Sequence, residues 1–379
     1  MKLSPEVERF REEIRRFAEK EIEPRSRWIE ENDAIPDDLM AKARDLGLFG
    51  ITIPEEYGGV ALDLAGKCMV EEELGRSNYG FATVIANHTG ISTHPIVTLG
   101  SEAVKRRYLP RMASGEWVGS FALTEPSAGS DPAAMRTTAV KKGDRYILNG
   151  EKIFITNAGI AHVFTVMAIT DRTKGIKGIS AFVVERGFPG FSIGKNELKM
   201  GMHGATTAPL AFTDCEVPAE NLLGAEGMGY IQALKTLTRG RVTIAARSCG
   251  IMDRLIERCV EYMKMRTQGG RKIAEYQGLQ WMLADMAVQR DASRALTERA
   301  IEALTRGERA TMEASVAKLY TTEALGKVAD AAVQIHGGMG YMREAGIESY
   351  YRDCRIVRIY EGSSEIQRNI IAGQLLKNE

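Results

Sequence analysis

One carboxylate stands in an unusual place, within the segment RIVRIYEGSSEIQRNIIAGQLL (residues 355–376). Glu361 lies between Tyr360 and a Gly-Ser-Ser turn, just before an amphipathic run. An acid near a helix start could stabilise the helix dipole by about 0.3–1 kcal/mol. Ser363 and Ser364 are better placed as the N-cap of that helix. Glu361 is left without an obvious structural role in a glycine-flanked loop, so it could instead take a proton from a bound molecule.

Two segments of small residues could approach a ligand closely. The first, SFALTEPSAGSDPAAM (residues 120–135), offers hydroxyls and backbone amides to a flat or phosphate-bearing ligand, although an ordinary capped turn explains it equally well. The second, QIHGGMGYMREAGIE, begins at Gln334 and has more glycines than a helix C-cap needs. It lacks the GxGxxG pattern after a strand, so a Rossmann site is not indicated. His336 is more typical of a helix end or a packing position than of a catalyst.

Several basic residues fall in stretches compatible with helices. We expect most of them to be solvated or paired on the surface. A few beside a glycine-rich pocket would suit the phosphates of a dinucleotide or of coenzyme A, because guanidinium binds phosphate through two hydrogen bonds. The residues are Arg239, Arg241, Arg247, Arg266, Arg271 and Lys272.

The elements that must position these residues follow a helical, β, helical order. Val7, Phe10, Ile14 and Phe17 recur every three or four positions and predict one buried helix face. Further helices are predicted in PDDLMAKARDLGLFG, in LAGKCMVEEELGRSNYGFATVIANH as one run, and in SEAVKRRYLPRMASGE. From about residue 119, short runs rich in Val, Ile, Phe and Thr predict a β-domain. Three long helical segments after Pro218 predict an antiparallel bundle. The expected domains are residues 1–118, 119–222 and 223–379.

Composition narrows the function classes. A chain of 379 residues suggests two or three packed units. Lys plus Arg and Asp plus Glu both total 50, which gives no support to a nucleic-acid partner. The five cysteines form no CxxC or Cys/His cluster, so we expect no zinc site but free, mostly buried thiols in a reducing compartment. No apolar run suits a signal peptide or a membrane span, which favours a cytoplasmic protein without a membrane partner.

Five segments, in this order along the chain, resemble signatures of the acyl-CoA dehydrogenase family. They are ALTEPSAGSD, NGEKIFITNA, LKMGMHGATTAPLAFTDCEVPAENLLG, QIHGGMGY and IYEGSSEIQR. The resemblance implies an α+β multidomain fold, with an N-terminal α-helical domain, a middle β-barrel or β-sandwich domain and a C-terminal four-helix bundle, assembled as a homotetramer. It also implies non-covalent FAD, an acyl-CoA substrate, electron-transfer flavoprotein as the electron acceptor, and a place in fatty acid metabolism such as β-oxidation.

The resemblance also assigns roles to matching positions. Glu361 matches the catalytic base, which takes the α-proton of the thioester while the β-hydrogen leaves as hydride to flavin N5. Some relatives carry the base on the long helix, where this chain has Gly240. Positions matching FAD contacts, some of them across a subunit boundary, are Phe121, Ala122, Leu123, Thr124, Ser130, Phe154, Ile155, Thr156, Arg266, Gln277, Gln334, Ile335, His336, Gly337, Gly338, Ser363, Ser364 and Glu365. Positions matching acyl-CoA contacts are Ser130, Thr238, Arg241 and Gly362.

Two positions depart from the family pattern. Gly269 stands where an aromatic residue is usual, and Thr238 stands where an acid commonly precedes Arg241 by three residues. These departures put one wall of the FAD site and one CoA contact in doubt, but neither touches the reacting centre.

Other activities remain open at this point. An acyl-CoA oxidase would use the same base, but those relatives are usually much longer. A nitroalkane oxidase-like relative would carry Asp at position 361. A non-catalytic scaffold of the same fold would bind acyl-CoA or a partner without reducing flavin.

The sequence says least about the acyl group. Gly240 on the long helix resembles the short-chain branch of the family, which implies a short, branched or alicyclic acyl group. Asn87, His88, Thr89 and His94 make the early segment polar. This polarity could belong to the surface, or it could line a pocket for a non-fatty acyl group.

Overall fold

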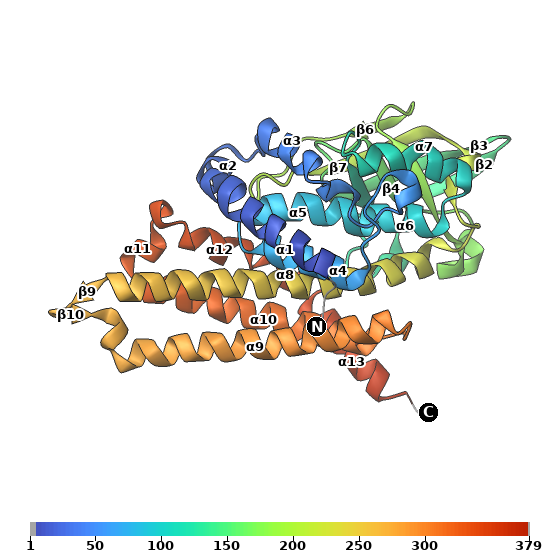
Figure 1. The fold of residues 1–379 in the computed structure, drawn as a ribbon. Coiled ribbons are helices and arrows are strands. Elements are labelled where there is room, and N and C mark those ends of the chain that lie inside the picture. The colour runs from blue at the N-terminus through green and yellow to red at the C-terminus, as the bar shows by residue number, and fades with distance from the viewer. Residues whose placement is uncertain (1–4, 378–379) are drawn as a thin grey trace.

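The N-terminal part of the chain is helical in the computed structural model, which describes residues 5–377 (Figure 1). Ile14 and Phe17 of the first helix are buried, and Val7 and Phe10 pack against the same core, so the predicted buried face is confirmed. The helices are α1 (Pro5–Phe17), α2 (Ser26–Asn32), α3 (Asp37–Asp45), α4 (Leu64–Gly75), α5 (Tyr79–Asn87), α6 (Thr93–Leu99) and α7 (Glu102–Ala113).

One predicted helix is divided in two. The run LAGKCMVEEELGRSNYGFATVIANH forms α4 and α5, because the chain leaves the helical conformation at Asn78. The Asn78 side chain accepts a hydrogen bond from the Phe81 backbone N–H at 2.9 Å and so caps a new helix. The prediction of a single run was wrong, because the first helix ends at Gly75 and Asn78 caps a separate helix.

The middle part of the chain is an eight-stranded sheet, with strand order β6-β7-β3-β2-β4-β5-β8 and β1 paired with β4. Tyr146 of β3 contacts Phe182 of β5, and Phe164 of β4 contacts Phe191 of β6, each with ring centroids 4.9 Å apart. Because these strands are not neighbours in the sheet, the sheet must curl around a shared core. The strands are β1 (Gly119–Ala122), β2 (Thr138–Lys142), β3 (Arg145–Thr156), β4 (Val163–Ile169), β5 (Ile179–Glu185), β6 (Phe191–Ile193), β7 (Thr207–Pro218) and β8 (Leu222–Leu223).

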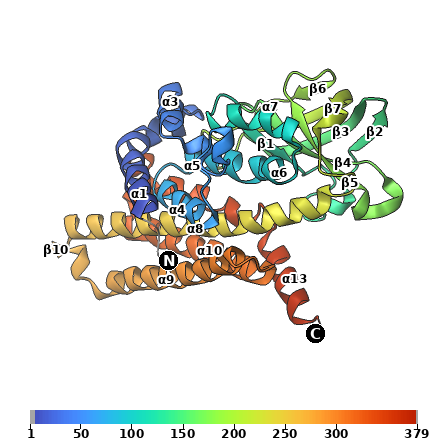
Figure 2. The same cartoon turned by 45° about the vertical axis from the view of Figure 1, so that its right-hand side comes forward.

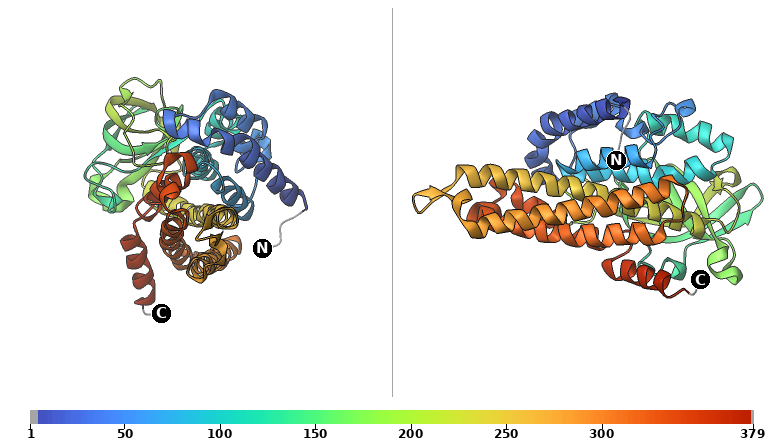
Figure 3. Two further views of the ribbon diagram at one scale, coloured as in Figure 1. Left: turned by 90° about the vertical axis from the view of Figure 1, so that its left-hand side faces the viewer. Right: turned by 60° about the horizontal axis from the view of Figure 1, so that its bottom comes forward.

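The C-terminal part is the predicted helical bundle (Figure 3). The hairpin of β9 (Thr267–Gln268) and β10 (Arg271–Lys272) joins its first two helices at one end. Arg266, Arg271 and Lys272 therefore lie at a helix end and in a hairpin, and their prediction as helical residues was wrong. The helices are α8 (Gly229–Met265), α9 (Gln277–Thr305), α10 (Thr311–His336), α11 (Gly338–Tyr341), α12 (Ile347–Asp353) and α13 (Ser364–Leu375).

Two further sequence features can be checked against the fold. All five cysteines are buried thiols, as expected. Among residues 5–377, no helix is both long enough and apolar enough to span a lipid bilayer.

The N-terminal helices contact the bundle where α4 crosses α8 (Figure 2). At this crossing the two backbones touch, because both helices carry glycine there. A Cβ at Gly250 would lie 1.8 Å from the Glu72 carbonyl oxygen, and a Cβ at Gly75 would lie 2.4 Å from the Arg247 carbonyl oxygen. The position of α4 against α8 therefore depends on the absence of side chains at these two residues.

Gly250→Ala is expected to destabilise the protein by about 1–3 kcal/mol, because a backbone carbonyl cannot move away as a flexible side chain would. Gly278→Ala is the matched control, since a Cβ there meets nothing within 4 Å. Alanine in that open helical position should be neutral or stabilising by up to about 1 kcal/mol. Urea unfolding of both variants checks the prediction, and equal stabilities would contradict the close contact.

Candidate active site

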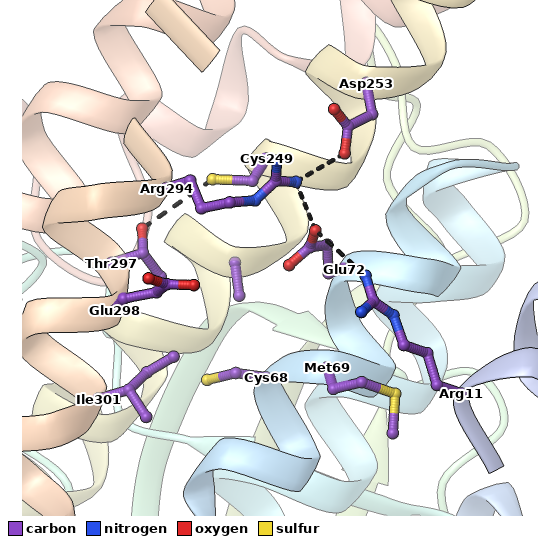
Figure 4. A pocket seen from close by; sticks show the side chains of 11 residues that line it. Arg11, Cys68, Met69, Glu72, Cys249, Asp253, Arg294, Thr297, Glu298 and Ile301 are labelled. Carbon is purple, nitrogen blue, oxygen red and sulfur yellow. Dashed lines mark hydrogen bonds and ion pairs between the residues drawn. The ribbon is translucent and has the colours of Figure 1, made fainter. Parts of the chain in front are cut away.

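A cavity of about 390 Å³ lies between α1, α4, α8 and α9 (Figure 4). Arg294 donates to Glu72 at 2.5 Å and to Asp253 at 2.7 Å, and Arg11 lies 3.9 Å from Glu72. These acids and bases neutralise one another between the N-terminal helices and the bundle. The cavity therefore belongs to the interface between these two parts of the fold.

A larger cavity, of about 760 Å³, lies where α4, α5, the start of the sheet, α8 and the segment before α13 meet. It brings together segments that are far apart in the sequence. The predicted site residues that line it are Phe121, Leu123, Thr124, Ser130, Phe154, Ile155, Thr156, Arg241, Glu361, Gly362 and Ser363.

Other predicted site residues are outside this wall. Arg266 lies about 40 Å along α8 from Gly240, as the rise per residue of a helix requires. Gln277 begins α9 beyond the same hairpin, and the run from Gln334 to Gly338 ends α10. A single chain therefore does not bring this set to the cavity. Ala122, Thr238, Ser364 and Glu365 belong to elements that reach the cavity but are not part of its lining.

The backbone at Glu361 makes a tight turn into α13. Glu361 and Gly362 both have left-handed conformations, with φ of 52° and 92°. A left-handed conformation is unfavourable for glutamate, so surrounding contacts must hold it. The Gly362 carbonyl accepts hydrogen bonds from Lys318 Nζ and from the Gln367 amide, each at 2.8 Å. Ser363 caps α13 as predicted, at 3.4 Å to the Ile366 N–H.

Ser364 has a different role from the one predicted for it. Its hydroxyl donates a 2.6 Å hydrogen bond to Glu323 on α10 instead of capping α13. The interpretation of both serines as the N-cap was therefore right for Ser363 only. The contact with Glu323 also ties the start of α13 to the bundle.

The Glu361 carboxyl group points toward α8. Its Oε2 atom is buried and has no hydrogen-bond partner among the described residues. A Cβ at Gly240 would lie 2.0 Å from that oxygen, so any side chain at position 240 would displace the carboxylate. Buried polar atoms normally have partners. An unpaired carboxylate oxygen beside a cavity is the arrangement expected of a base whose substrate supplies the missing contact.

The surroundings of Glu361 bring its pKa close to neutrality. Burial raises the pKa to about 7, opposed by the positive charges of Arg247, Lys318 and Arg241. Burial also lowers the pKa of Lys318 to about 8. A carboxylate with a pKa near working pH can accept a proton and later release it.

A buried charge network lies behind the base. Arg247 Nε is 3.2 Å from Glu71 on α4, and Lys67 Nζ donates to the same Glu71 at 2.9 Å and to Thr89 at 2.6 Å. Arg247 and Arg241 are both buried in the cavity lining, so they belong with the few basic residues expected beside a pocket and not with the majority expected on the surface. Sequence reasoning missed Lys67 and Lys318. Only Lys67 gave a signal, because it stands four residues before Glu71, the spacing of an ion pair on one helix face.

The polar early segment is not a surface feature. Asn87, Thr89 and His94 line the large cavity, whereas His88 is fully buried beside it. His88 Nδ1 accepts the Gly119 N–H at 2.8 Å, and burial lowers the pKa of His88 and of His94 to about 4. Both imidazoles are therefore neutral. Three of the four residues line a pocket, and a non-fatty acyl group as its occupant stays a prediction.

His336 is a packing residue within this chain, as its position at a helix end suggested. Its Nδ1 lies 2.8 Å from the Ala332 carbonyl, and its ring stacks on Tyr262 with centroids 4.4 Å apart.

Family models match almost the whole chain. Those described as the N-terminal, middle and C-terminal domains of acyl-CoA dehydrogenase match residues 4–116, 120–215 and 227–376. The chain belongs to the acyl-CoA dehydrogenase family. An acyl-CoA dehydrogenase of Bacillus subtilis is 44% identical over 376 residues, covering 99% of each chain. The family models and this relative confirm the resemblance found in the sequence and the predicted order of helical, sheet and helical parts.

Two solved structures superimpose on the full length of the chain. One is described as the electron transferring flavoprotein of Acidaminococcus fermentans, with a TM-score of 0.97 and 41% identity over all of both chains. The other is butyryl-CoA dehydrogenase of Megasphaera elsdenii, with a TM-score of 0.96 and 37% identity over all of both chains. The protein is thus an oxidoreductase of the acyl-CoA dehydrogenase type, and its cofactor is FAD.

The cavity wall fits a flat aromatic cofactor. Phe154 sits in a β-bulge of β3 with φ of 56°, and its side chain is 65% exposed toward the cavity that it lines. A bulky residue with positive φ is a genuine outlier, so the bulge has a specific cost. Phe121 and the hydroxyls of Thr124 and Thr156 stand in the same wall. An exposed ring and hydroxyl groups are suited to stacking on an isoalloxazine and hydrogen bonding to its edge.

Proposed function

We propose that the protein catalyses α,β-dehydrogenation of an acyl-CoA thioester, with Glu361 as the base. The observation that carries the proposal is the buried, unpartnered Oε2 of Glu361, which faces the cavity on a group whose pKa is about 7. The α-C–H of a thioester is a weak acid, so a base and a stabilised carbonyl oxygen must act together. Glu361 would accept the α-proton, and bound FAD would supply the hydride acceptor for the β-hydrogen.

The backbone supports the developing enolate. The Glu361 N–H has no acceptor among the described hydrogen bonds, so it is free to donate to the thioester oxygen. The two left-handed residues at this turn, held by Lys318 and Gln367, fix the direction of that N–H. Such a preorganised donor needs no rearrangement when negative charge develops on the oxygen.

Other residues would position the ligands. Ser130, Arg241 and Gly362 line the cavity and would contact the acyl-CoA. The flavin ring would lie against the wall that includes Phe121, Phe154 and Thr156. Arg266, Gln277 and the run from Gln334 to Gly338 would bind FAD of a neighbouring subunit, with Ser363, Ser364 and Glu365 completing the contacts.

An FAD site divided between subunits requires an oligomer, and we propose a homotetramer. Trp281 and Val288 on α9 are each 62% exposed and stand seven residues apart, on one face of the helix. Large apolar side chains at such positions favour an interface with another copy. We extend the proposal to electron-transfer flavoprotein as the acceptor, supported by the likeness to the Acidaminococcus structure. The domains would run over residues 1–118, 119–222 and 223–379.

The proposal is tested by anaerobic titration of the purified flavoprotein with straight-chain butyryl- to palmitoyl-CoA and with branched and alicyclic acyl-CoAs. We expect bleaching of the long-wavelength flavin band by short, branched or alicyclic chains. Gly240 resembles the short-chain branch of the family, and the Megasphaera relative is a butyryl-CoA dehydrogenase. A protein that holds flavin but is reduced by none of the acyl-CoAs would contradict the role of Glu361.

A further inference from the structure

The wall of the large cavity carries an excess of positive charge. Among its described lining residues Glu361 is the one acid, whereas four side chains are basic, namely Lys67, Arg239, Arg241 and Arg247. Cations removed from water are unfavourable unless an anion meets them. The fatty part of an ordinary acyl chain offers no anion.

Three of these cations have partners. Lys67 and Arg247 share the carboxylate of Glu71, at 2.9 Å and 3.2 Å. Arg241 Nε lies 3.5 Å from the Glu361 carbonyl oxygen. Lys67 and Arg247 carry two positive charges against the single negative charge of Glu71. This side of the cavity is therefore positive even without Arg239.

Arg239 has no such partner. Its guanidinium makes no hydrogen bond or ion pair with any residue between 5 and 377, and burial lowers its pKa. The acid that acts on it through space is Asp63, whose Oδ1 accepts the Gly66 N–H as the N-cap of α4. A guanidinium that is partly desolvated and unpaired, in the wall of a substrate cavity, is a receptor for a planar anion.

The position of Arg239 limits where that anion can be. It directly precedes Gly240, the residue against which the Glu361 carboxyl group lies. Both side chains line the same cavity, so an acyl chain whose α-carbon faces Glu361 would carry an anion at its far end toward Arg239. His94, also in the wall, is within electrostatic reach of Arg239 and neutral, since burial lowers its pKa to about 4, and so it does not compete for the anion.

We propose that the cavity takes an acyl group whose far end carries a carboxylate, bound by Arg239 through two hydrogen bonds. The substrate class is then a short dicarboxylic acyl-CoA. This rests on the proposed function, because it names the substrate of the same site. The same anion chemistry could be satisfied by a phosphate of coenzyme A, and the experiment separates the two sources.

The experiment compares glutaryl-CoA with pentanoyl-CoA, and adipyl-CoA with hexanoyl-CoA, in wild type, Arg239→Gln and Arg239→Lys. Lys235→Gln is the matched control, an exposed lysine one turn earlier on α8 and outside the lining. Two readouts are used. One is kcat/KM, and the other is the dissociation constant in the Glu361→Gln holoenzyme, from the change in flavin absorbance on binding. Free coenzyme A is titrated in parallel.

We expect wild type to prefer each ω-carboxyl ligand over its length-matched partner. Arg239→Gln should reduce that preference about 10- to 100-fold, as for loss of a charge-assisted hydrogen-bonded pair. Arg239→Lys should recover part of it, and Lys235→Gln should keep it. A wild-type preference for the plain acyl chains, or a ratio unaffected by Arg239→Gln, overturns the inference. So does a uniform weakening of all CoA esters and of coenzyme A, which would assign Arg239 to a phosphate.

The failure of this inference differs from failure of the proposed function. If pentanoyl-CoA reduces the flavin and the binding ratio does not respond to Arg239→Gln, the inference fails and the dehydrogenase stands. If none of the acyl-CoAs reduces the flavin but the ratio falls in Arg239→Gln, the dehydrogenase proposal fails and the carboxylate site stands.

Discussion

Glu361→Gln is expected to keep FAD and the fold but to lose activity by about 10²- to 10⁴-fold, the contribution of a positioned general base. The substitution is nearly isosteric, so the left-handed turn and its contacts with Lys318 and Gln367 should survive. The amide cannot accept the α-proton, because it has no basic oxygen of comparable proton affinity. The measurement is single-turnover flavin reduction by the best acyl-CoA from the anaerobic titration.

The pH profile gives a second readout for the same variant. The carboxyl group must be ionised to act as a base, so kcat/KM of wild type should fall as pH drops through an apparent pKa near 7. The residual activity of Glu361→Gln should lack that limb. Glu55→Gln, at an exposed glutamate outside the cavity lining, is the control and should keep both rate and profile. Near-normal turnover by Glu361→Gln would refute the assignment.

The sequence predicted the elements with local signals. Periodicity identified α1 and the long helices, and strand-rich runs identified the sheet. Glu361 was found because the serines after it explained the helix start and left the acid without a role. The division between α4 and α5 was missed because the polar break at residues 75–78 is short, apolar residues resume at Tyr79, and the capping hydrogen bond of Asn78 is a single side-chain contact.

The electrostatic part of the site was beyond prediction from the sequence. The sequence did not show whether Arg247 is a surface or a buried residue, because its acid partner, Glu71, is on another helix far away in the chain. Only the crossing of α4 and α8 at Gly75 and Gly250 brings the two together. Likewise, nothing local indicated that Gly240 makes room for the Glu361 carboxylate, or that Arg239 beside it has no partner.

Arg247→Met is expected to destabilise the protein by about 3 kcal/mol. Breaking a buried ion pair costs about 3–5 kcal/mol, and the lower end applies because Lys67 still neutralises Glu71. The substitution also removes the 3.1 Å hydrogen bond from Arg247 to Thr83. Arg299→Met is the control, since Arg299 lies 3.7 Å from Glu313 with 65% of its side chain exposed, and such a pair contributes less than about 1 kcal/mol. Denaturant unfolding of both holoenzymes measures the difference.

The same substitution should move the acidic limb of the pH profile. Arg247 is the largest of the positive influences that lower the pKa of Glu361 against burial, so its removal raises that pKa further. The protonated, inactive form would then persist to higher pH, and kcat/KM would reach its plateau at a higher pH than in wild type. Arg247→Lys keeps the charge and should shift the limb less, which provides a folded variant if methionine is not tolerated. An unmoved limb in both variants would show that Arg247 supports the α4–α8 contact without tuning the base.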